Sequence, residues 1–180
     1  MKKKIIILSI SVISIFILYR VFRYDIREYL KSRHIIRWSK NVKIYFKDYE
    51  GKANPKDDYN IHHYHGIYLK ANNIKDAHAV AFFNKEKSWI IDSTNVPNEE
   101  REIQLMRFNL HEYYARKINE EIDKIRNDNS TEFKVLEDIY NRNYSELKND
   151  ESRMFSNEFT TKVNVENYKS EIDSLLSTVE

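Results

Sequence analysis

The sequence predicts an α+β fold in which a small, mostly antiparallel sheet precedes a long helix and two further helices. Between Ile35 and Ile91, aromatic and β-branched residues alternate with polar ones, which is typical of strands. After Pro97 the apolar residues recur with the period of a helix. Strands followed by helices indicate an α+β arrangement. Hydrophobic residues make up 41% of the 180 residues, enough to form the core of one domain.

Residues 1–24 predict a signal anchor, that is, a single transmembrane helix. Lys2, Lys3 and Lys4 precede an apolar run from Ile5 to Tyr19. A basic start followed by an apolar block is typical of signal peptides and signal anchors. No small residues that would suit cleavage follow the block, which favours an uncleaved anchor. We therefore expect a membrane contact through this helix and a separate domain over residues 25–180.

Four segments of the first half predict strands. Val42–Phe46 is rich in β-branched and aromatic residues, and Ile61–Leu69 alternates clearly between two faces. Two shorter strands are expected at His78–Phe83 and Ser88–Ile91, joined by the turn residues Asn84–Lys87. This spacing predicts a hairpin.

Three helices are expected in the second half. The first follows Pro97, a residue suited to a helix start, and carries an apolar stripe formed by Ile103, Met106, Leu110, Tyr114, Ile118, Ile122 and Ile125. Asn129 and Glu132 have the spacing of a capping box at the start of the second helix. The third helix is expected after Asn164.

Composition excludes several functions. The chain has no cysteine, so disulfides, thiolate metal sites and a cysteine nucleophile are excluded. The 30 basic residues fall to 27 once the three N-terminal lysines are set aside, against 28 acidic residues. A near-neutral domain lacks the basic surface that nucleic acid requires, so we expect no nucleic-acid partner. No glycine-rich phosphate loop or nucleophile elbow is present.

Several short motifs occur in the order found in one known family. They are Phe46–Gly51, Tyr64–Ile67, Lys87–Trp89 and Phe108–Lys117. With them the chain resembles the domain of unknown function 922 family, which is predicted to comprise secreted zinc-dependent proteases of bacteria. The resemblance implies a zincin-like domain over residues 25–180, exported to the periplasmic or extracellular side. Together with the anchor it implies a single-pass protein of the bacterial cell membrane.

The zinc motif of that family is absent from this chain. Its His-Glu-x-x-His segment would fall at residues 103–107, where Ile103 cannot bind a metal and Gln104 cannot act as a base. Arg107 would place a positive charge where the cation should lie. Glu112 matches a family position that is implied to be a metal ligand or a structural acid. The resemblance therefore implies a pseudopeptidase of the cell envelope with no catalytic residue and no cofactor, which binds a protein or peptide partner.

An alternative is a metal-dependent hydrolase with a relocated site. His63 and His65 of the His62–His65 cluster share a strand face, and His78 on a following strand would supply a third imidazole. Such histidine-rich segments bind zinc or related metals when they converge. A third hypothesis is a structural subunit that uses only its outer helix faces. His111, which lacks a second histidine four residues later, is expected to be a solvent-facing or hydrogen-bonded helix residue.

Overall fold

The structure, a computed structural model, describes residues 32–53, 60–128, 132–155 and 162–179, together with Tyr19, Arg20, Phe22 and Tyr29. The side chains of residues 162–164 are not described. The chain divides into two compact units, Met1–Ile35 and Ile36–Glu180, and the second unit holds the elements discussed below. These elements form a small antiparallel sheet and three helices, which confirms the predicted α+β class.

No helix in the described part of the chain is long and apolar enough to cross a membrane. Helix α2 (Asn98–Ile125) has the length, at 28 residues, but it carries charged residues from Glu99 to Lys124, and charge is costly in the hydrocarbon core. The finding contradicts the predicted single-pass transmembrane helix, and with it the location in the bacterial cell membrane. Most of the segment 1–24 lies outside the described residues.

The main sheet has three strands in the order β1-β4-β3. Strands β3 (His65–Lys70) and β4 (His78–Asn84) are antiparallel, and the short β1 (Ile35–Arg37) lies on the other side of β4. A second, two-stranded sheet pairs β2 (Ile61–His62) with β5 (Trp89–Ile90). The strand predicted at His78–Phe83 is thus confirmed, whereas the one predicted at Ile61–Leu69 is divided between the two sheets.

Two predictions for this region are wrong. Val42–Phe46 forms no strand; irregular chain leads there into a 3₁₀ turn at Phe46–Asp48. The turn at Asn84–Lys87 does not close a hairpin, because β4 pairs with β3 while β5 pairs with β2. The side chain of the fully buried Ser88 explains the division, since its hydroxyl donates to the Asn84 carbonyl and accepts from the Tyr64 amide.

Alternation along the sheet places small and apolar residues on one face. The cross-strand pairs on this face are His65 with Phe83, Ile67 with Ala81, and Leu69 with Ala79. The alanines are buried and leave room for a helix to approach closely, and α2 packs against β3 and β4. The pairs on the opposite face are Gly66 with Phe82, Tyr68 with Val80, and Lys70 with His78.

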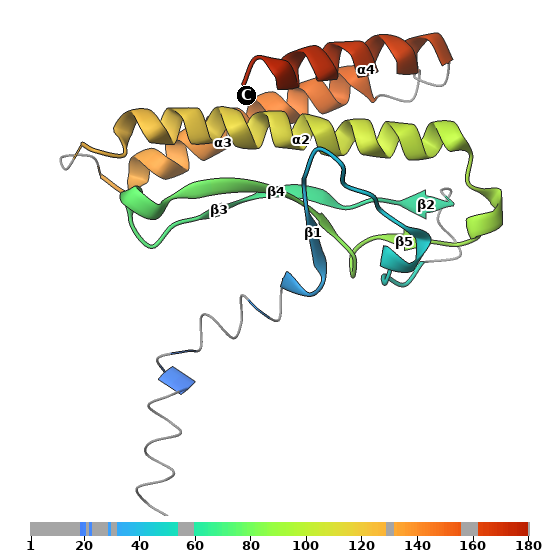
Figure 1. Ribbon diagram of the computed structural model, residues 1–180, viewed down its shortest axis with the longest axis horizontal. Coiled ribbons are helices and arrows are strands. Elements are labelled where there is room, and N and C mark those ends of the chain that lie inside the picture. Colours follow the sequence, from blue (N-terminus) through green and yellow to red (C-terminus); the bar gives the residue numbers. More distant parts are fainter. Residues whose placement is uncertain are drawn as a thin grey trace, which may run out of the picture. The chain divides into compact units, whose positions relative to one another are not determined.

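Helix α2 packs on β3 and β4 and also contacts the other two helices, α3 (Lys134–Met154) and α4 (Lys162–Ser177); Figure 1 shows α4 on the side of α2 away from the sheet. The buried residues of α2 therefore cover more of its surface than the single predicted stripe: Gln104, Met106, Phe108, Leu110, His111, Tyr114, Ala115, Ile118 and Ile122. Polar contacts fix the position of α3. The Tyr114 hydroxyl donates to Asp150 (2.7 Å) and the Tyr140 hydroxyl donates to the Ile67 carbonyl of β3 (2.8 Å).

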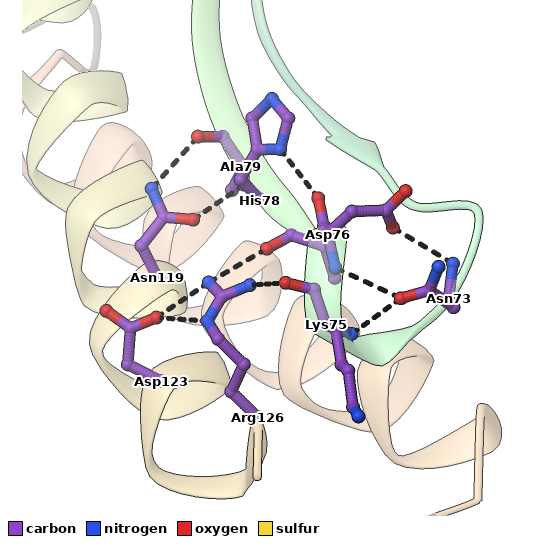
Figure 2. Close-up of polar contacts among 9 residues, drawn as sticks. Asn73, Lys75, Asp76, His78, Ala79, Asn119, Asp123 and Arg126 are labelled. Carbon is purple, nitrogen blue, oxygen red and sulfur yellow. Dashed lines mark hydrogen bonds and ion pairs between the residues drawn. The ribbon is translucent and has the colours of Figure 1, made fainter.

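The C-terminal half of α2 is attached to the β3–β4 connection by side chains that bind backbone (Figure 2). The Asn119 amide accepts from the Ala79 N–H (2.7 Å) and donates to the Ala79 carbonyl (3.0 Å). The Arg126 guanidinium donates to the carbonyls of Lys75 and Ala77 and pairs with Asp123. Strand β1 lies along the same edge of β4, and just beyond β1 the Trp38 N–H donates to the Ala81 carbonyl. Where this short strand ends, the Asn119 side chain binds the backbone of β4 in its place.

We expect Asn119→Ala to destabilise the protein by about 2 kcal/mol, because unsatisfied buried polar groups cost about 1–3 kcal/mol each. Urea denaturation followed by circular dichroism measures the change. The exposed neighbour Glu120 provides the control, and Glu120→Ala should change the free energy of unfolding by less than about 0.5 kcal/mol. Equal effects of the two substitutions would contradict the proposed role of Asn119.

Candidate functional site

A polar cavity of about 240 Å³ lies where the start of β3 meets helices α2 and α3. We call it the histidine pocket. Three segments contribute its lining residues, which are His63, Tyr64, His65, Arg107, His111, Tyr144, Lys148 and Glu151. The pocket thus joins residues that are distant in the sequence.

His63 and Tyr64 lie between β2 and β3 and belong to neither strand, and this break places His63 at the pocket. The Ser88 hydroxyl holds the Tyr64 amide at 2.9 Å, next to His63 in the chain. His65 begins β3 on the face that packs against α2, and its ring stacks on Phe108 with a centroid distance of 5.1 Å. The His65 ring lies 5.5 Å from that of His63 and 5.7 Å from that of His111. Three imidazoles therefore gather at one wall of the cavity.

The Tyr49 side chain contacts His63 and holds its ring in place. Its hydroxyl lies 2.5 Å from the Nε2 atom of His63, and the two rings meet edge to face. Two backbone hydrogen bonds hold this segment against the turn after β4: Glu50 N–H donates to Lys85, and Gly51 N–H donates to Ser88. A side chain at position 51 would lie only 2.7 Å from the carbonyl oxygens of Glu86 and Ser88, so glycine is required for this close approach.

His111 is 2% exposed, so the expectation of a solvent-facing histidine is wrong and that of a hydrogen-bonded one is confirmed. Its Nδ1 lies 2.8 Å from the Arg107 carbonyl, one turn earlier in α2. A carbonyl only accepts, so Nδ1 carries the proton and the neutral ring presents Nε2 as an acceptor. Nε2 lies 3.9 Å from a carboxylate oxygen of Glu151.

All three pocket histidines are neutral near pH 7. Burial is the main cause of the lowered pKa of each ring, and the positive charge of Arg107 contributes in every case. The pKa of His63 falls to about 3, with further contributions from His62 and Arg101. The imidazoles therefore add hydrogen-bonding groups to the pocket but no charge.

Arg107 supplies a positive charge that no described residue neutralises. Its Nε atom is buried without a hydrogen-bond partner, and its guanidinium lies over the Phe155 ring at 4.8 Å. Nε2 of His65 is likewise buried without a partner. The other cation, Lys148, is paired with Glu151 at 2.6 Å. Buried polar groups are usually satisfied in folded proteins, and both of these unpartnered nitrogens belong to residues that line the pocket.

Among the four degenerate motif positions, only Arg107 lies in the histidine pocket. Ile103 is partly buried against the core. Gln104 is buried and donates to Glu100 (2.9 Å). Glu112 accepts a hydrogen bond from Arg116 (2.9 Å), and burial raises the pKa of Glu112 although that contact opposes the shift.

The structure does not bring His78 to His63 and His65. His78 pairs with Lys70, at the far end of β3 from His65 and on the opposite face of the sheet. Its Nδ1 instead bonds to the Asp76 carbonyl (2.9 Å; Figure 2). Among the described residues, no three histidine, aspartate or glutamate side chains are arranged to hold a metal ion.

The sequence reasoning missed His111 and the three residues from α3. The signal was present, because Arg107 and His111 are four residues apart and share a helical face. Tyr144, Lys148 and Glu151 have the same one-face spacing on α3. What the sequence did not provide was the packing of α3 against this part of α2.

No family model matches the chain, and no curated protein or solved structure does so either.

The neutral histidines predict a stability that decreases in acid. Their folded pKa values lie below the ordinary value near 6.5, so the unfolded chain binds more protons and the free energy of unfolding falls as the pH drops from about 6.5 toward 5. Each such histidine contributes a slope of up to about 1.4 kcal/mol per pH unit. Urea unfolding at several pH values measures it.

His65→Phe should make this pH dependence shallower, because phenylalanine keeps the stacking on Phe108 without a titrating group. The exposed His78 is the control, and His78→Gln should leave the slope unchanged. A slope that His65→Phe does not alter would show that His65 is not held neutral by the fold.

Proposed function

We propose that this chain is a non-catalytic binding protein whose ligand occupies the histidine pocket. The observation that carries the proposal is the buried, unpartnered Nε of Arg107 in a cavity with no described counter-charge for it. Leaving a charged donor unsatisfied costs free energy, which a ligand with a suitable acceptor would recover. The fold therefore recovers this free energy when the ligand binds.

Several features support the absence of catalysis. Gln104, at the position of the general base, is bonded to Glu100 and has no titratable group. Glu151, the pocket carboxylate, is paired with Lys148. The hydroxyl of Ser88 already donates to Asn84 and accepts from Tyr64, so it is not available as a nucleophile.

As part of the same proposal, the domain is a degenerate relative of the domain of unknown function 922 family, a pseudopeptidase that binds a protein or peptide segment. The support comes from geometry and sequence. A long helix after Pro97 packs on a small sheet, and Arg107, at the position of the second zinc histidine, lines the cavity beside two histidines of the sheet side.

A metal-dependent hydrolase is the second candidate. It is favoured by His111, which lies beside His65 and would supply the third imidazole expected from His78. It is also favoured by the neutral state of the three rings, because neutral imidazole is the form that binds metals. Arg107 opposes it, because a fixed cation beside the rings repels a metal ion. Elemental analysis of the untagged protein after dialysis against zinc separates the candidates: stoichiometric zinc favours the hydrolase.

We expect the wild-type protein to enrich a set of peptides from a random library and to release them uncut, as mass spectrometry would show. Arg107→Trp, which fills the pocket, should lower the enrichment by about tenfold or more, equivalent to about 1.4 kcal/mol. The matched control is Lys124→Trp on the same helix, at an exposed position. Cleaved peptides would contradict the non-catalytic function, and equal enrichment by Arg107→Trp would contradict the pocket.

The family relationship makes a separate prediction. The triple variant Ile103→His, Gln104→Glu and Arg107→His restores the family motif and should bind one equivalent of zinc, measured by competition with a chromophoric chelator. Arg107→His alone is the control, since it creates a histidine pair with His111 four residues later. If the single variant binds zinc as well as the triple variant does, the motif has been misplaced on the helix.

A further inference from the structure

The charge balance of the histidine pocket limits the ligand. With three neutral imidazoles and Lys148 paired with Glu151, Arg107 contributes one positive charge that the described residues leave unmatched. One negative charge on the ligand matches it. A guanidinium binds carboxylate and phosphate alike through paired N–H groups. Phosphate carries up to two negative charges at neutral pH, one more than the unmatched charge of Arg107, so a carboxylate matches the pocket better.

The pocket also presents acceptors. Nε2 of His111 is an unprotonated acceptor 3.9 Å from Glu151, since Nδ1 donates to the Arg107 carbonyl. A ligand that fits both sides therefore carries a carboxylate for Arg107 and an N–H donor for His111. The last residue of a peptide carries both groups on one α-carbon, as does an acylated amino acid.

A second cavity adjoins the first. It measures about 150 Å³ and shares His63 with the histidine pocket as a common wall. Its other lining residues are the apolar or aromatic Val42, Ile44, Tyr45, Tyr49 and Leu105 together with two cations, Lys43 and Arg101. An apolar side chain next to the bound carboxylate would lie here and lose its exposure to water.

We propose that the histidine pocket binds the free α-carboxylate of an acylated amino acid or peptide C-terminus, with the last, apolar side chain in the cavity beyond His63. The inference rests on the proposed binding function and names its ligand class. Arg107 holds the carboxylate, and the orphan Nε2 of His65 gains a partner on the ligand. His111 accepts the amide N–H of the same residue.

Titration of the full chain with acetyl-Ala-Ala-Leu tests the proposal, followed by the histidine ring resonances in NMR spectra. Binding of the free acid should shift the pocket histidines, and the C-terminal amide should bind about tenfold to a hundredfold more weakly, because it lacks the charge. Replacing the last leucine by glycine should also weaken binding about tenfold or more, because the apolar cavity stays unfilled. N-acetylleucine alone tests whether the upstream residues contribute.

Arg107→Gln should remove the preference for the acid over the amide, whereas Lys124→Gln should retain it. Equal binding of acid and amide, competition by inorganic phosphate at equal concentration, or no histidine shift with any probe would each overturn the carboxylate assignment. The library experiment decides the binding function independently. Enriched peptides that depend on Arg107 but share no free C-terminus would leave that function standing without this inference.

Discussion

Helix α2 is buried on two sides at once, and the rest of the unit Ile36–Glu180 is arranged around it. One side lies on the alanine-rich face of β3 and β4, and the other is covered by α3 and α4. A helix buried in this way has little free surface, so its polar residues need partners within the fold. Asn119 and Arg126 find them in the backbone of the β3–β4 connection, and Tyr114 finds one in α3.

Arg107 and His111 are polar residues of the same helix that lie where the packing is incomplete. Near them, β3, α2 and α3 leave a cavity and do not close on one another. His111 satisfies its Nδ1 within the helix, whereas Nε of Arg107 is left without a partner. Two arginines of this region differ in their surroundings, because Arg126 binds two carbonyls and a carboxylate whereas the Nε atom of Arg107 has no partner among the described residues.

The class of the fold could be predicted because it depends on periodicity, which each segment carries in itself. His78–Asn84 and the helix after Pro97 are examples. The strand predicted at Val42–Phe46 was wrong because β-propensity takes effect only beside a partner strand, and this segment belongs to neither of the two sheets. For the site, Arg107, His63 and His65 were identified from the sequence. His78 was misplaced because the turn at Asn72–Ala77 sets the register, so that His78 pairs with Lys70 on the outer face.

The position of the third imidazole decides which charges surround it. His78 lies on the face of the sheet that carries Tyr68 and Phe82, away from α2 and from His65. With His111 in that role, the cluster is joined to the helix that carries Arg107, and one fixed cation lowers the pKa of every ring around it. Burial keeps the imidazoles neutral, and the arginine adds to that effect while its fixed charge disfavours a metal ion at the same place.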